Sequence, residues 1–483
     1  MKGHEIPSSD LRRLGLGTQR WQSAWSCKRE QEVYLNLQSR TRELNRNPRL
    51  ALGLRILLLT GLLLCLYLAV KQGIARWYFR KSMPQAVQTA IRWDSGDPEY
   101  FDSLATLKHI YADTEDSGEI VSLCETATRL SPHNAQYWAH LGAAYEWAGR
   151  KEDARRAFEH SRQLFPNSPD INWQLANFYV RAHMTTGALR ALRKVLEGQG
   201  VARWDVFALA ASATRDNQAI LDEMLPPRSD IFLEYLNYQV AAKNIDAAGR
   251  VWTRLLQLNQ PFDFQQSFPY MDALIQFREI DRLVDAWSTL VQRFPEQIGS
   301  HIAKTNLITN GSFEFKILNG GLDWRITPVE GATVSTDLKS SSDGARSLRI
   351  DFDGTRNLDY GGLFEYVPVK PSSRYRFSGL MRVSGITTDS GPRFQVFDAY
   401  DMRKLFLSTQ NLVGTSAWTP QELEFKTGAD TRLLVVRIAR PLSRKFDNRI
   451  AGTVWVDQVS LIGEDAMEAL ARLGFALCFH TMA

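Results

Sequence analysis

The sequence predicts a multidomain chain in which a transmembrane helix is followed by an all-α solenoid of helical hairpins and then by an all-β sandwich. Three observations predict this order: one long apolar segment near the N-terminus, a 34-residue self-similarity in the middle third, and short alternating segments in the last third. With 483 residues the chain has room for about three domains. Because 44% of its residues are hydrophobic and 23% are charged, it is neither disordered nor a multi-span transporter.

The net charge of +5 belongs to the N-terminal segment. Residues 1–49 carry ten Lys and Arg against five Asp and Glu, and the rest of the chain balances at 48 of each. No domain is basic enough to bind nucleic acid through its phosphates, so a membrane surface is the expected partner of this segment. The four cysteines are scattered without CxxC or Cys/His spacing, which predicts neither a disulfide framework nor a zinc site.

Residues 50–70, LALGLRILLLTGLLLCLYLAV, predict the membrane-spanning helix. These 21 residues can cross a hydrocarbon core of about 30 Å, and Arg55 lies near the start, where its side chain can reach the interface. The 49 preceding residues favour an uncleaved signal anchor over a cleaved signal peptide, and a buried core helix is the alternative. The basic residues close to the two ends of the span are equal in number. Only the longer basic segment 1–49 therefore favours an N-terminus in the cytoplasm. Residues 71–99 are expected to form a juxtamembrane linker.

The clearest repeat lies at residues 134–167. Its marker residues are Trp138, Leu141, Gly142, Tyr145, Ala154, Phe158 and Pro166. In a helical pair the small residues let the two helices touch, the large ones fill the seam, and the proline ends the second helix. Similar residues recur 34 positions before and after this unit. The later pairs Trp252 with Pro261 and Trp287 with Pro295 extend the predicted hairpins to about residue 296.

Residues 100–299 therefore resemble a tetratricopeptide domain of about six repeats, of which only the 134–167 unit is near consensus. In that family the first helix of each repeat lines a concave groove that holds an extended peptide or another protein. The resemblance implies a protein partner, and the groove residues it implies are Gln136, Glu146, Trp173, Asn177 and Arg181. The alternatives are that these are ordinary solvated or packed positions, and that the array is a spacer or binds through its convex side.

Near residue 300 the helical periodicity ends, and short alternating segments separated by Gly, Ser, Asp and Pro clusters begin. Seven or more such segments predict an antiparallel sandwich. They include SLRIDF (347–352), FEYVPV (364–369), YRFSGLMRV (375–383), RFQVFDAY (393–400), QELEFKT (421–427), LLVVRIA (433–439) and VWVDQVSLI (454–462).

The order of the sequence markers in this third is more specific than the strand count. The markers are NLITNGSFE (306–314), GARSLRI (344–350), VPVKPSSRYRFSGLMRV (367–383), Trp418 and VWVDQVSL (454–461). They resemble the jelly-roll carbohydrate-binding modules attached to xylanases and cellulases, over residues 305–463. In those modules the acidic residue of the opening motif and the Asp of the closing strand ligate a structural calcium ion, which implies Glu314 and Asp457 here. Carboxylate oxygens suit Ca²⁺; the alternative is that both residues only hydrogen-bond the backbone of a turn.

Sugar recognition needs aromatic faces that stack on pyranose rings and planar polar side chains that reach hydroxyl groups. Aromatic residues in loops or at strand ends, and polar residues on strands, are the candidates: Trp324, Tyr360, Gln395, Tyr400, Trp418 and Arg437. The alternative is that the aromatic residues belong to the core of the sandwich, and Trp418 before Thr419-Pro420 matches a framework position of the resembled modules.

No motif for a metalloprotease, a serine hydrolase or a nucleotide-binding loop is present, and the eight His are dispersed, so we expect no enzyme. We expect a single-pass protein of the bacterial inner membrane with periplasmic C-terminal domains. It is predicted to be a scaffold in envelope or exopolysaccharide assembly or export that binds a protein and a polysaccharide. The alternatives are an interaction adaptor whose sandwich is purely structural, and a degenerate glycoside-active enzyme, since the spacing of catalytic carboxylates is set in three dimensions. The tail 464–483 is expected to pack on the sandwich or to hang free.

Overall fold

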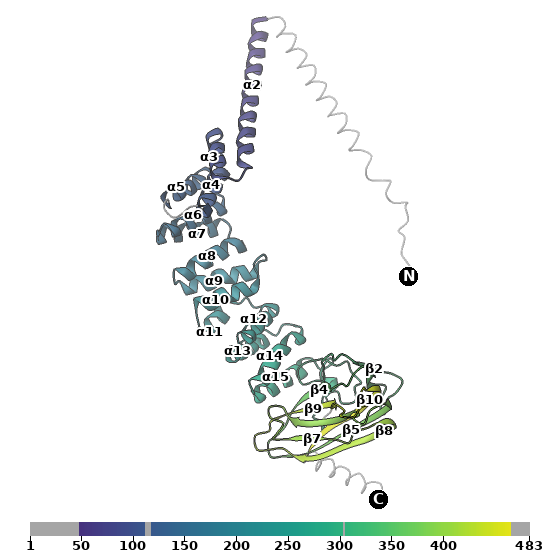
Figure 1. The fold of residues 1–483 in the computed structure, drawn as a ribbon. Coiled ribbons are helices and arrows are strands. Elements are labelled where there is room, and N and C mark those ends of the chain that lie inside the picture. The colour runs from purple at the N-terminus through teal and green to yellow at the C-terminus, as the bar shows by residue number, and fades with distance from the viewer. Residues whose placement is uncertain (1–47, 112–116, 303–304, 465–483) are drawn as a thin grey trace, which may run out of the picture. The chain divides into compact units, whose positions relative to one another are not determined.

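A computed structural model describes residues 48–111, 117–302 and 305–464 of the chain (Figure 1). It divides into two compact units, one that ends at Phe178 and one that begins at Tyr179. The change from helices to strands occurs near residue 300, as expected, but it lies inside the second unit. Nearly all of the basic segment 1–49 and of the tail 464–483 lies outside the described residues.

The first unit is helical. Its helices are α2 (Pro48–Phe79), α3 (Pro84–Trp93), α4 (Pro98–Tyr111), α5 (Ser117–Leu130), α6 (Ala135–Trp147), α7 (Lys151–Leu164) and α8 (Pro169–Arg181), whose last residues pass into the second unit.

Helix α2 contains the predicted span and continues beyond it. The segment Leu52–Phe79 has 28 residues, and at about 1.5 Å per residue it is long enough to cross a membrane. An 18-residue window within it has a mean hydropathy of 2.2 and no buried residue. The last turns of α2 bury Ala75 in a cluster with Val87 of α3 and Tyr100 of α4. Residues 71–99, expected to form a juxtamembrane linker, are therefore mostly helical.

The α6–α7 hairpin uses its marker residues as the repeat pattern predicts. Gly142 of α6 lies against the ring of Phe158 of α7, and a Cβ atom on Gly142 would lie 2.8 Å from that ring. Trp138 Nε1 donates a hydrogen bond of 2.8 Å to the carbonyl of Pro132, which ties the first helix to the turn before it. Small and large residues at these positions thus close the seam between the two helices.

The second unit continues the hairpins. Its helical elements are α9 (Thr185–Glu197), α10 (Arg203–Ala213), α11 (Asn217–Ala219), the π-helix η1 (Ile220–Met224), α12 (Ser229–Ala241), α13 (Ile245–Gln257), the 3-10 helix η2 (Phe264–Ser267), α14 (Phe268–Gln276), α15 (Ile280–Arg293) and the 3-10 helix η3 (Gly299–His301).

The first helices of four hairpins end in the same turn. A left-handed residue follows each of α6, α8, α12 and α14, namely Gly149 (φ 76°), His183 (φ 59°), Lys243 (φ 57°) and Arg278 (φ 62°). In each turn the next N–H donates to the carbonyl five residues earlier, which is a Schellman closure. Only the near-consensus repeat has glycine at this position, where a side chain costs about 1 kcal/mol.

The sandwich has two five-stranded sheets in which every pairing is antiparallel. The strands are β1 (Arg325–Ile326), β2 (Ala332–Asp337), β3 (Ser347–Asp353), β4 (Tyr360–Pro368), β5 (Arg374–Ile386), β6 (Arg393–Asp398), β7 (Phe406–Ser408), β8 (Gly414–Lys426), β9 (Leu433–Arg440) and β10 (Ala451–Gly463). The strand orders are β1-β4-β9-β6-β7 and β2-β3-β10-β5-β8. Most consecutive strands lie in different sheets, as in a jelly roll, and the predicted strand segments lie largely within β3, β4, β5, β6, β8, β9 and β10.

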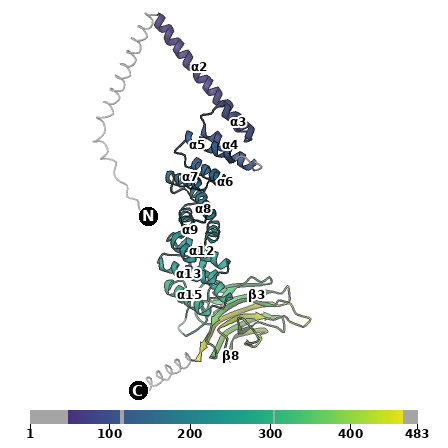
Figure 2. The same cartoon turned by 90° about the vertical axis from the view of Figure 1, so that its left-hand side faces the viewer.

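The last helical hairpin packs on the sandwich, and Figures 1 and 2 both show α15 beside it. Gly320 lies against Phe268 of α14, and Gly321 lies against Trp287 of α15. Cβ atoms at these glycines would lie 2.2 Å and 2.3 Å from the two rings, so neither position has room for a side chain. This contact explains why the helices after Tyr179 and the sandwich form one compact unit.

Candidate functional site

The first helices of the first unit carry a row of hydrogen-bonded polar side chains. Asp102 of α4 and His140 of α6 meet at 2.7 Å through Oδ1 and Nδ1, and His140 Nε2 lies 2.8 Å from Nε2 of Gln136. The backbone N–H of Gln136 also donates to the capping side chain of Asn134. Gln136, one of the five predicted groove residues, is therefore held by neighbours that the sequence did not single out.

The other predicted groove residues lie on the same class of helix. Trp173 and Asn177 are half-buried on α8, where Asn177 Nδ2 donates to the carbonyl of Trp173 at 2.9 Å. Glu146 is half-buried on α6, and Arg181 is exposed in the last turn of α8. All five residues thus lie on first helices, but the role of this surface in binding stays a prediction.

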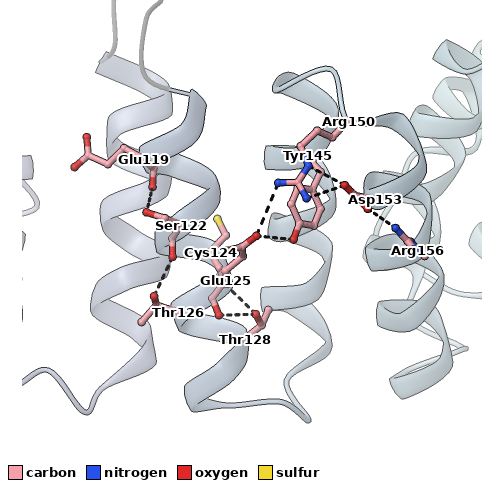
Figure 3. Close-up of polar contacts among 10 residues, drawn as sticks. All are labelled: Glu119, Ser122, Cys124, Glu125, Thr126, Thr128, Tyr145, Arg150, Asp153 and Arg156. Carbon is pink, nitrogen blue, oxygen red and sulfur yellow. Dashed lines mark hydrogen bonds and ion pairs between the residues drawn. The ribbon is translucent and has the colours of Figure 1, made fainter.

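A second polar cluster joins the second helix of one repeat to the next repeat (Figure 3). Tyr145 of α6 donates through its hydroxyl to Glu125 of α5 at 2.8 Å, and the guanidinium of Arg150 lies 4.3 Å from the centre of the tyrosine ring. Arg150 also pairs with Asp153 of α7 at 2.7 Å. Burial, together with the hydrogen bond to Glu125, raises the pKa of Tyr145 to about 12. These contacts connect α5, α6 and α7 and fix the register between the repeats.

Two of the predicted sugar-stacking residues are core residues, which corrects the expectation for them. Trp324 is 0% exposed and Tyr360 is 2% exposed, and both belong to the hydrophobic core between the sheets. Their rings pack against Phe313 and Phe352, respectively, so no ring face is open to a sugar. Burial also raises the pKa of the Tyr360 hydroxyl.

Gln395, which is buried at 4% exposure, and the half-buried Arg437 are brought together on the face of the β1-β4-β9-β6-β7 sheet that points away from the hydrophobic core. They are register partners on β6 and β9, and Arg437 Nε donates to Gln395 Oε1 at 2.8 Å. The guanidinium of Arg437 also lies 4.9 Å from the ring centre of Phe397. Phe406 on β7, next to Phe397 and 44% exposed, adds an aromatic surface that the sequence did not single out. This group combines polar and aromatic side chains on one sheet face.

Tyr400 is occupied by the helical part of the second unit. Its hydroxyl donates to the carbonyl of Ile275 in α14 at 2.7 Å, and the guanidinium of Arg278 lies 4.7 Å from its ring centre. Burial raises the pKa of Tyr400 to about 12. Arg325 of β1 pairs with Asp272 of α14 at 2.6 Å beside this contact. The structure therefore places Tyr400 in a junction between helix and sheet, which corrects its assignment as a sugar platform.

Trp418 lies away from the Gln395 and Arg437 pair. It is half-buried on β8, an edge strand of the other sheet, beside an irregularity in the pairing with β5. Of the six predicted sugar contacts, only Gln395 and Arg437 contact each other in the structure.

Glu314 and Asp457 converge on the turn before β3. Glu314 Oε1 accepts hydrogen bonds from the N–H groups of Ala345 and Arg346, at 2.9 Å and 3.0 Å. The fully buried Asp457 accepts hydrogen bonds from the N–H of Ser342 at 2.8 Å and from the N–H of Gln458 at 2.7 Å. Burial raises the pKa of Asp457, and the negative charge of Glu314 adds to that shift.

These contacts match the alternative in which both carboxylates bind the turn backbone. Among the residues that the structure describes, no three His, Cys, Asp or Glu side chains gather as metal ligands. A calcium ion here would take Glu314, Asp457 and backbone carbonyls of the turn as ligands, because Ca²⁺ needs six to eight oxygens. Two carboxylates at the same turn supply oxygen ligands of the kind that Ca²⁺ prefers, and calcium binding stays a prediction.

Another buried acidic group was not predicted. Glu365 of β4 is fully buried; its Oε1 accepts from the N–H of Thr309 at 2.7 Å, and its Oε2 has no partner among the described residues. Burial raises its pKa well above the ordinary value, and the charge of Asp323 adds to the effect. Asp323 in turn lies 3.4 Å from His301 Nδ1. Strand alternation does not predict this group, because Glu365 occupies an inward position that alternation assigns to an apolar residue.

A cavity of about 970 Å³ also lies outside the predicted sites. It separates the second helices α13 and α15 and is lined by Trp252, Tyr270, Arg250, Arg254 and Arg282, among others. Two of these arginines are paired, Arg282 with Asp246 and Arg254 with Asp222. The loss of consensus residues in these repeats is the sequence signal for such a loose contact between second helices.

Comparison with known proteins adds one sequence relative. No protein-family model matches the chain. The TPR repeat-containing protein YpiA of Bacillus subtilis (strain 168) is 28% identical over 104 residues, which are 22% of this chain and 25% of that protein. The chain thus spans about a quarter of the length of this curated relative. The similarity supports tetratricopeptide-like repeats in the helical part.

Several solved structures are similar to parts of the chain. They include the Family 16 Carbohydrate Binding Module-2, at 18% identity and a TM-score of 0.24 over 32% of this chain and 99% of that chain. MamA matches at 16% identity and a TM-score of 0.24, over 27% of this chain and 77% of that chain. PilF of Pseudomonas aeruginosa matches at 14% identity and a TM-score of 0.24, over 48% of this chain and 91% of that chain. At these TM-scores the likenesses establish no property of the chain.

Proposed function

We propose that the chain is a membrane-anchored, non-enzymatic scaffold that binds a protein through its helical repeats and a glycan through its sandwich. It works at the bacterial inner membrane, with its repeats and sandwich in the periplasm, in the assembly or export of an envelope polysaccharide. The observation that carries the proposal is the hydrogen-bonded row of Asp102, His140 and Gln136 on first helices, the surface that a tetratricopeptide array offers to a partner. The exposed apolar length of α2 supports the anchor.

The protein partner can be tested by site-specific photo-cross-linking in cells. Ala143 is exposed on α6 and lies seven residues after Gln136, so it is on the same side of the helix. A photoreactive residue at Ala143 is expected to give an adduct of defined mass, whereas the same residue at the exposed Glu152 of the second helix α7 is expected to give none. No adduct at Ala143, or the same adduct at both positions, would contradict binding through the first helices.

The glycan is proposed to contact the half-buried Arg437 and the exposed Phe406, which lie beside the buried Gln395 and Phe397 on one face of this sheet. A paired amide and guanidinium can bind hydroxyl groups, while an exposed aromatic ring can stack on a sugar. The full chain, purified in a detergent without a sugar headgroup, is expected to bind members of a glycan array. Arg437→Gln should weaken that binding about tenfold, because a charged hydrogen bond is lost. The control Arg376→Gln, on the other sheet, should leave binding unchanged.

A specific observation favours a second function, that of an adaptor whose sandwich is structural. Tyr400 contacts Ile275 and Arg278, and Trp324 and Tyr360 are in the core, so three of the four predicted aromatic platforms serve the fold. Under this alternative the array shows no glycan binding, and cross-linking at Ala143 still gives its adduct.

Calcium at Glu314 and Asp457 is proposed as a structural clamp of the sandwich. The melting temperature of the full chain is expected to rise in about 1 mM calcium chloride relative to a chelator, a concentration that suits extracellular calcium modules. Glu314→Gln should remove that rise, and Glu424→Gln, an exposed position on β8, should keep it. Equal melting temperatures with calcium and with chelator would leave only the backbone hydrogen bonds as the role of the two carboxylates.

A further inference from the structure

The junction of α2 and α3 contains a cavity of about 500 Å³. Its lining residues are Val70, Gly73, Ile74, Trp77, Tyr78 and Trp93. A Cβ atom on Gly73 would meet nothing within 4 Å, so the cavity is open at that glycine. Val70 belongs to the predicted span, and the cavity is therefore continuous with the apolar surface of α2.

Two tryptophans on this cavity are unusually exposed. Trp77 is 58% exposed and Trp93 is 40% exposed, although other side chains of the same helices are buried against α4. Indole rings with one apolar side and one N–H group favour the boundary between headgroups and acyl chains of a membrane. The pair of indoles thus places the cavity at the depth of the lipid headgroups.

One cation contacts a lining residue of the cavity, and three more are close to lining residues in the sequence. Lys81 Nζ lies 3.7 Å from the ring centre of Trp77, and Lys71, Arg80 and Arg92 are neighbours of the lining residues in the sequence. Within the described part of the chain, none of these four side chains lies within 4.0 Å of a carboxylate oxygen. The nearest acidic residues in the sequence are Asp94, which accepts a hydrogen bond from the N–H of Gly96, and Asp97, which accepts one from the N–H of Glu99 in α4.

We infer that the α2–α3 junction binds an anionic phospholipid, whose acyl chain occupies the cavity and whose phosphate contacts the surrounding cations. The inference rests on the proposed membrane anchor and deepens it, because it names the lipid class at the point where the helical repeats leave the membrane. An apolar cavity alone would accept any lipid chain. The unpaired positive charges provide the preference for an anionic headgroup, since each basic residue near a membrane surface adds about 1 kcal/mol of attraction.

Native mass spectrometry of the full chain tests this inference. The protein, in a detergent without a sugar headgroup, is mixed with equal amounts of phosphatidylglycerol and phosphatidylcholine that carry identical acyl chains. It is expected to retain phosphatidylglycerol about tenfold more than phosphatidylcholine. Combined replacement of Arg80, Lys81 and Arg92 by Gln should remove the preference. Gly73→Leu should lower the retention of both lipids, because its side chain fills the cavity.

A matched control carries three Gln substitutions at Arg129, Lys151 and Arg162, on α5 and α7. The inference is overturned if wild type shows no preference, or if this control loses the preference as completely as the junction variant. It is also overturned if an excess of the soluble headgroup glycerophosphoglycerol displaces the lipid, because the site would then recognise phosphate without an acyl chain.

Flotation with pure phosphatidylcholine vesicles separates this inference from the proposed anchor. A chain that floats and resists alkaline extraction but shows no lipid preference has the anchor without the lipid site. A chain that does not float but retains phosphatidylglycerol in detergent has the lipid site without the anchor.

Discussion

The α6–α7 hairpin and the sandwich both rely on aromatic residues, but the sequence assigns those residues correctly only in the hairpin. Phe158 lies where the repeat spacing predicts, in the seam against Gly142. Trp324 and Tyr360 lie in the core of the sandwich, not on its surface. Helical spacing defines one buried side, whereas strand alternation defines two faces without stating which is buried. The comparison teaches that an aromatic residue in a sandwich needs its strand register before it can be assigned to a site.

The hairpin side of this comparison is tested most strongly by Gly142→Leu. The leucine side chain would overlap the ring of Phe158, so we expect the free energy of unfolding to fall by about 3 kcal/mol. Urea denaturation followed by hydrogen exchange in α6 and α7 measures the change. Ala143→Leu, which adds the same residue at the next, exposed position, should be nearly neutral. Equal losses in both variants would mean that the seam does not depend on close approach at Gly142.

The junction between helices and sandwich is tested by Gly321→Ala and its control Gly385→Ala. Both glycines have positive φ, 61° and 66°, so both variants acquire backbone strain. Only at Gly321 would the new Cβ meet another residue, 2.3 Å from the ring of Trp287, whereas Gly385 has nothing within 4 Å. We expect Gly321→Ala to cost about 2 kcal/mol more than the control in thermal unfolding of the full chain. Equal costs would show that strain alone acts at both sites.

The polar core of the sandwich is tested by Glu365→Gln. Because burial raises the pKa of Glu365 in the folded state, the folded chain holds this proton more tightly than the unfolded chain. The free energy of unfolding therefore falls as pH rises above the unfolded value of about 4.3. At pH 8 the Gln variant should be more stable than wild type by about 1 kcal/mol, and near pH 4 the two should be equal.

Measured unfolding curves across this pH range check the prediction for Glu365. Asp323 and His301 are near Glu365 and are present in both proteins, so the difference between the two curves isolates Glu365. A difference that does not change between pH 4 and pH 8 would contradict a raised pKa.

The smallest expected effect concerns the turns that end the first helices. Lys243→Gly gives α12 the residue that the near-consensus repeat has at Gly149, where φ is also positive. Relief of the left-handed strain should stabilise the full chain by about 0.5 kcal/mol. Lys339→Gly, at an exposed position after β2, is the control and should not stabilise. Destabilisation by Lys243→Gly would mean that the lysine side chain makes a contact worth more than the strain.

Much of the fold could be predicted, because its main patterns are local. The hairpin spacing continues to α15, and seven strands were predicted from alternation. The strands β1, β2 and β7 were missed. Two and three residues, in β1 and β7, are too short to alternate, and the six residues of β2, ATVSTD, contain few large apolar side chains. Of the candidate site residues, Gln395 and Arg437 contact each other, and their role in sugar binding stays a prediction. Tyr400 was misassigned, because its partner Ile275 is 125 residues away and no local pattern reports such a contact.

The contact of α14 and α15 with the sandwich has a consequence for how the array can change its length in evolution. A hairpin gained or lost between α9 and α13 leaves Phe268, Trp287, Gly320 and Gly321 in place. Loss of the α14–α15 hairpin would instead expose both glycines and remove the acceptor of Tyr400. Proteins that share this junction are therefore expected to differ in the number of repeats before Phe268 and to keep the final hairpin.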